Sequence, residues 1–355
     1  YIASVIDVQF KKTISANGLN TFVFANNNQS SSAGSANYPS NSMIGSDIYF
    51  DTSAINSKFA DGSYAALTLI HEIGHALGLE HPFSYAQAGG GGLSDPPYLT
   101  GAEDSTAWTV MSYEDTSAQY YLNFSPLDTA ALQYIYGPSK TARAGNDIYK
   151  VSSSAPNFIW DGAGTDTIDL SAVNQGATIF LTPGYWGFVG SQQAATITSS
   201  GQVTVNFGSI IENLTGSSFA DKLYGNDADN YIVGGLGNDW LEGWDGNDVL
   251  VGGLGDDQLN GGAGIDTAQF EGPYDSYVTN SSQAAFFVTD KRSDVDGMDL
   301  LNNIERLKFL DKSVAIDLEG HAGKTVKVIG AVLGKDAVKN PGLVGIGLSY
   351  LDNDL

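Results

Sequence analysis

The chain of 355 residues contains no cysteine, which excludes a disulfide framework. Basic residues are scarce as well: 16 Lys and Arg stand against 40 Asp and Glu, and the formal net charge is -24. Such a surface repels nucleic acid and anionic membranes, so we expect neither as a partner. The sequence also has no apolar run long enough to form a membrane-spanning helix.

Only 16% of the residues are charged, so the acidic balance reflects a shortage of basic residues rather than an abundance of charge. A solubilising surface or adaptation to high salt would explain such a balance. The acidic residues cluster in a glycine-rich repeat, however, and this clustering indicates bound cations. A cation could also replace disulfides as the stabilising element of an exported protein.

Histidine is rare too, and three of the four histidines lie in the stretch H-E-I-G-H-A-L-G-L-E-H at residues 71–81. On a helix, His71 and His75 would share one face because they are four residues apart. Gly78 can adopt the left-handed conformation that ends a helix, and the turn would bring His81 back as a third ligand. Three neutral imidazoles that leave a fourth position for water are typical of a catalytic zinc site.

Glu72 follows the first of these histidines and can reach that water as a general base. A bare H-E-x-x-H also occurs on solvated helix faces and in structural metal sites. The glycine and the third histidine at fixed offsets favour catalytic zinc instead. The flanking sequence predicts a helix with Ser63 as its N-cap and with Ile70, Ile73 and Leu77 on a buried face.

A second motif, Thr-Val-Met-Ser-Tyr at residues 109–113, follows about thirty residues after the third histidine. A lone methionine in an apolar triplet usually belongs to a hydrophobic core. After this zinc motif, Met111 instead matches the Met-turn that lies beneath the zinc ion of metzincin proteases.

Together these motifs resemble the serralysins, which are secreted bacterial zinc metalloproteases. Serralysins carry proline after the third histidine, and this chain has Pro82 there. Residues 102–105 (Ala-Glu-Asp-Ser) and 125–137 also resemble serralysin sequence. On its own terms, the second of these stretches predicts a helix, because it begins with Ser and Pro and ends with Gly.

The resemblance implies a zinc ion bound by His71, His75 and His81, with Tyr113 as a further ligand at rest. In this family the tyrosine can swing away and stabilise the oxyanion. Packing in the core is the alternative role for Tyr113.

Residues 216–269 fall into six rows of nine residues in unbroken register. The sixth position is Asp in five rows and Asn230 in the other, and the eighth position is apolar in every row. A glycine turn and a short strand in each row predict a parallel β-roll with the eighth-position side chains stacked inside. A flexible Gly/Asp-rich linker is the alternative, but the periodic apolar position argues against it.

The rows also carry oxygen ligands for Ca²⁺, which takes roughly six to eight oxygens from turn carbonyls and carboxylates. The candidate ligands are Asp221, Gly235, Gly237, Asp239, Gly246, Asp248, Gly253, Gly255, Asp257, Gly262, Gly264 and Asp266. The rows resemble the repeats-in-toxin (RTX) nonapeptide, which in serralysins directly follows the catalytic domain. Through the resemblance alone we add Arg143, Gly145, Asp147, Asp161, Ala163, Gly164, Asp166 and Glu212, each of which could equally belong to an ordinary turn.

We therefore expect an α+β protein in which a metzincin-type, N-terminally short catalytic domain occupies residues 1–140. An all-β parallel β-roll domain should follow at 141–318, and strands at 299–309 and 314–318 should extend the roll. Residues 319–355 look more helical, and the sequence assigns them no role.

The short N-terminal region supplies three strand candidates, at residues 7–10, 21–24 and 47–50, which would form a three-stranded sheet. Seventy residues precede the zinc motif, whereas serralysins carry a longer segment there. We expect a processed or trimmed form whose sheet has lost at least one strand. The strand at 47–50 is our candidate for the edge strand that pairs with substrate.

The expected function is a secreted, extracellular zinc metalloendopeptidase that cleaves extended protein or peptide substrates and acts as a monomer. One zinc ion would be catalytic, and several calcium ions would be structural. The alternative is a non-enzymatic calcium-repeat protein, such as an adhesin or surface-layer module, with an incomplete or inactive protease domain.

Overall fold

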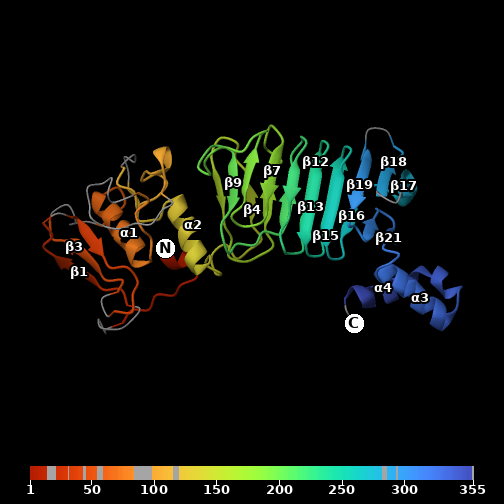
Figure 1. Ribbon diagram of the computed structural model, residues 1–355, viewed down its shortest axis with the longest axis horizontal. Helices are drawn as coiled ribbons and strands as arrows, with labels where there is room; N and C mark the ends of the chain where they lie inside the picture. Colours follow the sequence, from red (N-terminus) through yellow and green to blue (C-terminus); the bar gives the residue numbers. More distant parts are fainter. Residues whose placement is uncertain are drawn as a thin grey trace. The chain divides into compact units, whose positions relative to one another are not determined.

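The computed structural model describes residues 1–13, 21–30, 32–42, 45–53, 59–83, 98–114, 120–281, 286–292 and 295–353. The chain divides into two compact units, whose elements are labelled in Figure 1. The first comprises Tyr1–Ala144, Trp160–Gly162 and Asn206–Ser209, and the second comprises Gly145–Ile159, Ala163–Val205 and Ile210–Leu355.

Two helices form the centre of the first unit. Helix α1 (Tyr64–Ala76) begins where the Ser63 side chain accepts a hydrogen bond from Ala66 N at 3.2 Å, as its N-cap role predicts. Helix α2 (Pro126–Tyr136) has proline in its first turn and ends at Gly137, whose φ of 77° favours glycine. Both predicted helices are confirmed.

A three-stranded sheet packs beside α1 in this unit. Its strands are β1 (Phe24–Asn27), β2 (Gly34–Ala36) and β3 (Ile48–Asp51), and β3 lies in the middle. Strand β3 runs parallel to β1 and antiparallel to β2. Its buried residues Ile48 and Phe50 belong to a core shared with Ile70 of α1 and Leu132 of α2.

The number of strands agrees with the expectation, but their identity does not. Residues 7–10 form no strand: Asp7 N donates to Gly137 O, and Ile6 forms an isolated bridge with Pro138, so the segment follows the end of α2. The strand expected at 21–24 begins only at Phe24. The third strand is β2, whose Gly-Ser-Ala sequence contains none of the β-branched or aromatic residues that predict strands.

The second unit contains a β-roll built from two sheets, an eight-stranded one and a ten-stranded one. In the first sheet the order is β21-β20-β16-β14-β12-β10-β6-β4, and in the second it is β17-β18-β19-β15-β13-β11-β7-β8-β9-β5. The strands are β4 (Ile148–Lys150), β5 (Asn157–Ile159), β6 (Thr167–Asp169), β7 (Ala177–Phe180), β8 (Trp186–Val189), β9 (Gln202–Val205), β10 (Asn213–Thr215), β11 (Lys222–Tyr224), β12 (Tyr231–Leu236), β13 (Trp240–Asp245), β14 (Val249–Leu254), β15 (Gln258–Ala263), β16 (Thr267–Gln269), β17 (Tyr277–Ser281), β18 (Phe286–Asp290), β19 (Met298–Asn302), β20 (Arg306–Lys308) and β21 (Ser313–Ala315).

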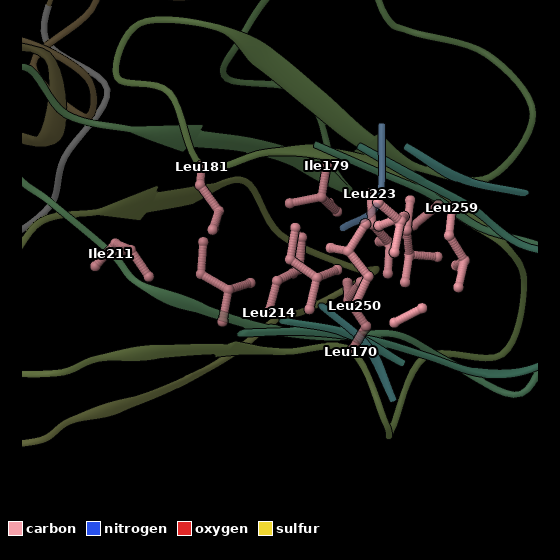
Figure 2. Packing of buried hydrophobic residues seen from close by; sticks show 14 of the residues in the cluster. Leu170, Ile179, Leu181, Ile211, Leu214, Leu223, Leu250 and Leu259 are labelled. Atoms are coloured by element: carbon pink, nitrogen blue, oxygen red, sulfur yellow. The ribbon is translucent and has the colours of Figure 1, made fainter. Parts of the chain in front are cut away.

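The nine-residue period explains this architecture. Consecutive rows contribute strands to opposite sheets, so a strand pairs in parallel with the strand two rows away, as Ile232 does with Leu250. The eighth-position side chains then point inward from both sheets and stack along the roll (Figure 2). All six are fully buried at 0% exposure: Leu223, Ile232, Leu241, Leu250, Leu259 and Ala268. The parallel β-roll is confirmed.

Beyond the six rows, the two sheets continue through β19 and β20, which pair in parallel with β15 and β16. The expected C-terminal strands are therefore present. The antiparallel hairpin β17–β18 precedes them. Two helices follow in the tail, α3 (His321–Leu333) and α4 (Pro341–Asp352). None of the helices in the described part of the chain has the length and hydropathy needed to cross a bilayer.

Candidate zinc and calcium sites

Three imidazoles converge at the end of α1. His71 and His75 lie on the helix, and His81 follows the turn at Gly78, whose φ is 103°. The Nε2 atom of His81 is 3.3 Å from the Nε2 atoms of both His71 and His75. Three nitrogens bound about 2.1 Å from one tetrahedral zinc ion would lie about 3.4 Å apart. Both distances from His81 Nε2 therefore fit zinc.

The hydrogen bonds of two of these rings also suit a metal. His71 Nδ1 lies 2.8 Å from Val110 O, and His75 Nδ1 lies 2.8 Å from Leu79 O. A carbonyl can only accept, so each Nδ1 carries the proton and each Nε2 keeps its lone pair. Burial, together with the neighbouring imidazoles, lowers the pKa of His75 to about 4 and that of His81 to about 3. The rings are neutral at physiological pH, as ligands must be.

Met111 lies directly against helix α1, which carries His71 and His75. A Cβ atom on Gly74 would be 2.6 Å from Met111 Sδ, so only glycine allows this approach. Met111 is almost fully buried within the core of the unit. The Met111 side chain thus packs against α1 at Gly74, the residue before His75.

Glu72 is buried, and its Oε2 atom makes no hydrogen bond with any described residue. Burial raises the pKa of Glu72 to about 8. The side chain lines a cleft of about 360 Å³, together with Ser32, Ala33, Gly34, Tyr64, Leu67, Thr68, His71, Thr106, Ser112 and Tyr113. A carboxylate beside three converging imidazoles in an open cleft can exchange a proton with a water molecule there.

Tyr113 lies beside the same imidazoles. Its ring stacks on His71 at a centroid distance of 5.8 Å and meets His81 edge-on at 4.8 Å. The side chain is 58% exposed, which is unlike a residue whose role is core packing.

The strand that borders this cleft is β2. The expectation that 47–50 would be the edge strand is wrong, because β3 is the central strand of its sheet. Gly34 of β2 approaches α1 so closely that a Cβ atom there would lie 2.8 Å from side-chain atoms of both Thr68 and Glu72. No other described strand pairs with the outer edge of β2.

The sixth-position residues of the repeat form two ladders of buried side chains. Asp221 N donates to Asp239 Oδ1 at 2.8 Å, and Asp239 N donates to Asp257 Oδ1 at 2.8 Å. The second ladder runs from Asn230 through Asp248 to Asp266 in the same way. In each case the acceptor lies 18 residues along the chain, two rows further on.

The second oxygen of these carboxylates fits a cation. The Oδ2 atoms without a hydrogen bond to any described residue are those of Asp239, Asp248, Asp257 and Asp266, and all four are buried. Burial, reinforced by neighbouring carboxylates, raises the pKa of Asp239 to about 8 and that of Asp248 to about 7. A bound hard cation would remove the penalty of ionising them.

Glycines form the turns between the rows. Glycines at the second and fourth positions adopt φ values between 104° and 147°, which other residues rarely reach. They are Gly235, Gly237, Gly246, Gly253, Gly255, Gly262 and Gly264. Trp244 takes the second position of its row at a φ of 80°.

Two residues that continue these ladders are not identified by the sequence analysis. Asp257 N donates to Asp299 Oδ1 at 3.0 Å, and Asp266 N donates to Glu305 Oε2 at 2.9 Å, so both continue the ladders. Residues 297–301 (Gly-Met-Asp-Leu-Leu) do carry the order of a row. The hairpin β17–β18 lies between them, so Asp299 comes 42 residues after Asp257 instead of 18. The nine-residue period of the sequence therefore does not reach Asp299.

Near the other end of the roll, Glu212 is equivalent to Glu305, because its carboxylate also accepts a hydrogen bond from the backbone N–H of an aspartate. Its Oε2 atom accepts from Asp166 N at 2.8 Å, and Asp166 Oδ1 accepts from Asp147 N at 2.7 Å. A Cβ atom on Gly164 would lie 2.0 Å from Gly145 O, so these two turns stack closely. The second unit contains all of these candidate ligands: Gly145, Asp147, Ala163, Gly164, Asp166 and Glu212.

The remaining candidate ligands, Arg143 and Asp161, belong to the first unit. The Arg143 guanidinium lies over the Trp160 ring at 4.0 Å and donates to Trp160 O at 2.9 Å. Asp161 is buried, and its backbone N–H donates to Ser209 Oγ at 3.1 Å.

Known protein families match both parts of the chain. The RTX calcium-binding nonapeptide repeat matches residues 208–241 and 234–268, and a peptidase family described as pregnancy-associated plasma protein-A matches residues 13–125. A serralysin from Proteus mirabilis is 37% identical over 194 residues, which are 48% of this chain and 37% of that protein. Serralysin G from Dickeya chrysanthemi is 33% identical over 216 residues, or 55% and 43% of the two chains.

A serralysin from Photorhabdus laumondii is 31% identical over 258 residues, which cover 65% of this chain. The chain is a relative of the serralysins. The resemblance seen in the sequence is thereby confirmed, and it implies catalytic Zn²⁺ and structural Ca²⁺. The chain spans between 37% and 52% of the length of these three serralysins, or about half at most.

Proposed function

We propose that this protein is a secreted zinc metalloendopeptidase that hydrolyses peptide bonds in extended protein or peptide substrates. Calcium bound in the roll would stabilise the second unit. The observation that carries the proposal is the convergence of three neutral imidazoles, with His81 Nε2 3.3 Å from the Nε2 atoms of the other two, beside the buried Glu72 in an open cleft. Such a donor set fits catalytic zinc and leaves room for a water and a substrate.

In this proposal His71, His75 and His81 hold the zinc, and Tyr113 is a further ligand at rest. Bound zinc supplies Lewis-acid polarisation of the scissile carbonyl and of a water molecule. Glu72 accepts a proton from that water and later donates it to the leaving amine. Burial raises the pKa of Glu72, and a zinc ion bound beside it would oppose that rise and favour the carboxylate that accepts the proton.

Tyr113 would stabilise the negative charge that develops on the carbonyl oxygen. Its ring already lies against His71 and His81, and its exposure leaves it room to move. The reaction needs this movement, because one hydroxyl group cannot bind the metal and the oxyanion in the same place.

The substrate would be held by β2 in an extended conformation. The outer edge of this strand carries backbone groups that can pair with a peptide, as in other cases of β-strand addition. Gly34 brings that edge next to Glu72, so a paired peptide would pass over the three imidazoles. Leu67 and Thr68 line the cleft beside His71 and would contact the side chain next to the scissile bond.

A casein digest tests the proposal. Calcium-loaded protein should cleave casein, lose activity with 1,10-phenanthroline, and regain it when zinc is added back. Calcium is kept in excess throughout, so that loss of activity reports zinc alone. A zinc-loaded, folded protein that cleaves neither casein nor an unfolded protein would contradict the peptidase proposal and favour the non-enzymatic alternative.

A further inference from the structure

Asp128 of α2 is a buried carboxylate with no ionic partner. It is 2% exposed, and no Lys, Arg or His pairs with it in the described part of the chain. Burying a carboxylate is unfavourable unless hydrogen bonds replace its water. Burial raises the pKa of Asp128 to about 6, and the hydrogen bonds it accepts oppose that rise.

One of these hydrogen bonds is local, and two are not. Ser125 N donates to Asp128 Oδ2 at 3.0 Å, which satisfies an N–H group at the start of α2. The other two come from far along the chain: Val110 N donates to Oδ2 at 2.8 Å, and Thr109 Oγ1 donates to Oδ1 at 2.6 Å. Capping of the helix therefore explains one of the three hydrogen bonds.

The two distant hydrogen bonds begin a chain that ends at a zinc-binding imidazole. Thr109 Oγ1 accepts from Met111 N at 3.1 Å. The N–H group of Met111 belongs to the same peptide unit as the carbonyl of Val110. That carbonyl accepts from His71 Nδ1 at 2.8 Å. The chain thus runs from Asp128 through Thr109 and the 110–111 peptide to His71.

His71 depends on this chain more than His75 does. The Nδ1 atom of His75 bonds to Leu79 O, only four residues away in the turn that ends α1. The Nδ1 atom of His71 bonds to Val110 O, which is 39 residues away and is oriented by the hydrogen bonds to Asp128. A partner that fixes the proton on Nδ1 also fixes the ring orientation and the basicity of Nε2.

We propose that Asp128 is a positioning residue of the zinc centre. Its carboxylate orients residues 109–111, so that Val110 O holds His71 as the Nδ1-protonated tautomer with Nε2 directed at the metal. This inference rests on the proposed zinc-peptidase function, because it assumes that His71 binds zinc. Asp128 itself touches neither metal nor substrate and acts through Thr109 and the 110–111 peptide.

Asp128→Asn is the direct test, because it keeps size and shape but replaces one acceptor oxygen with a donor. We expect the zinc affinity, measured by competition with a chelator, to fall by about 10–100-fold. The visible absorption spectrum of the Co²⁺-substituted protein should also change, since it reports the geometry of the ligands. Gln133→Met is the matched control: Gln133 is an equally buried polar residue of α2 whose hydrogen bonds go to Val5 and Asn206. It should lose stability but keep both metal readouts.

A second pair of variants keeps the test decisive if Asp128→Asn does not fold. Thr109→Val removes the hydroxyl that links Asp128 to Met111 N, whereas Thr109→Ser retains it. Thr109→Val should reproduce the lower zinc affinity and altered Co²⁺ spectrum, and Thr109→Ser should resemble the parent protein. A folded Asp128→Asn or Thr109→Val protein with parental zinc affinity and Co²⁺ spectrum would overturn the inference. A parent protein that binds no zinc at these histidines would overturn the proposed function instead.

Discussion

Gly34 of β2 lies against Glu72 of α1, where a Cβ atom would be 2.8 Å from Glu72 Cγ and 2.9 Å from Glu72 Oε1. The edge strand and the proposed general base therefore share a contact that leaves no space for a side chain. This closeness links substrate binding to chemistry, because any shift of the strand also displaces the carboxylate.

Gly34→Ala should lower kcat/KM on a peptide substrate by about 10–100-fold, because small displacements of reacting groups are costly. Zinc content should not change, since the histidines are not touched. Ser35→Ala on the same strand is the control and should retain activity. Full activity in Gly34→Ala would show that β2 does not position Glu72.

Glu72→Gln should retain zinc and lose roughly 10²–10⁴-fold in peptidase rate, because only the proton-accepting group is removed. His75→Ala should lose both zinc and activity, since it removes a ligand. Metal analysis and a casein assay on the same samples measure the two effects. Near-parental proteolysis by Glu72→Gln would show that another group takes the proton.

Tyr113→Phe should lower kcat by about 10–1000-fold with little change in KM, because the hydroxyl would act only in the transition state. Tyr64→Phe, in the same cleft, is the control and should leave kcat nearly unchanged. Steady-state kinetics with one peptide substrate distinguishes them. Loss of folding in Tyr113→Phe would instead indicate a packing role.

The calcium-free roll should become less stable as the pH rises. The folded-state pKa values of about 8 for Asp239 and about 7 for Asp248 lie above the value of about 4 for an exposed aspartate. The folded state therefore binds protons more tightly than the unfolded chain, and the free energy of unfolding should fall between about pH 4 and pH 8. Thermal unfolding of calcium-depleted protein, followed by circular dichroism, measures this fall.

Calcium should reverse that dependence, because a bound cation favours the ionised carboxylates. The calcium-loaded protein should be more stable at pH 8 than at pH 5 in the same measurement. A calcium-depleted protein with equal stability at both pH values would show that the ladder carboxylates do not titrate as their burial predicts.

Leu250→Ala should destabilise the roll by about 2–5 kcal/mol, since Leu250 is fully buried between the two sheets (Figure 2). Leu254→Ala on the same strand is the control, because Leu254 is 40% exposed at the turn. Denaturant unfolding in saturating calcium compares the two. Equal losses would mean that the inner stack contributes no more than the surface.

The sequence by itself determined the elements whose pattern is local and periodic. The spacing of His71 and His75, the cap at Ser63 and the turn at Gly78 depend on residues within one helix and its end. The nine-residue period likewise predicted the parallel roll and its buried eighth positions, since each row repeats the same turn and strand. In these cases neighbouring residues alone decide the backbone conformation.

Only the tertiary structure decided which distant residues meet. Strand β2 has no strand-like sequence, and it borders the cleft because β3 pairs with it and Gly34 fits against Glu72. Asp299 joins a ladder only because β17 and β18 form a separate hairpin, after which β19 pairs with β15. The link from Asp128 to His71 passes through residues of three separate segments. Such contacts depend on packing between segments, which no local spacing encodes.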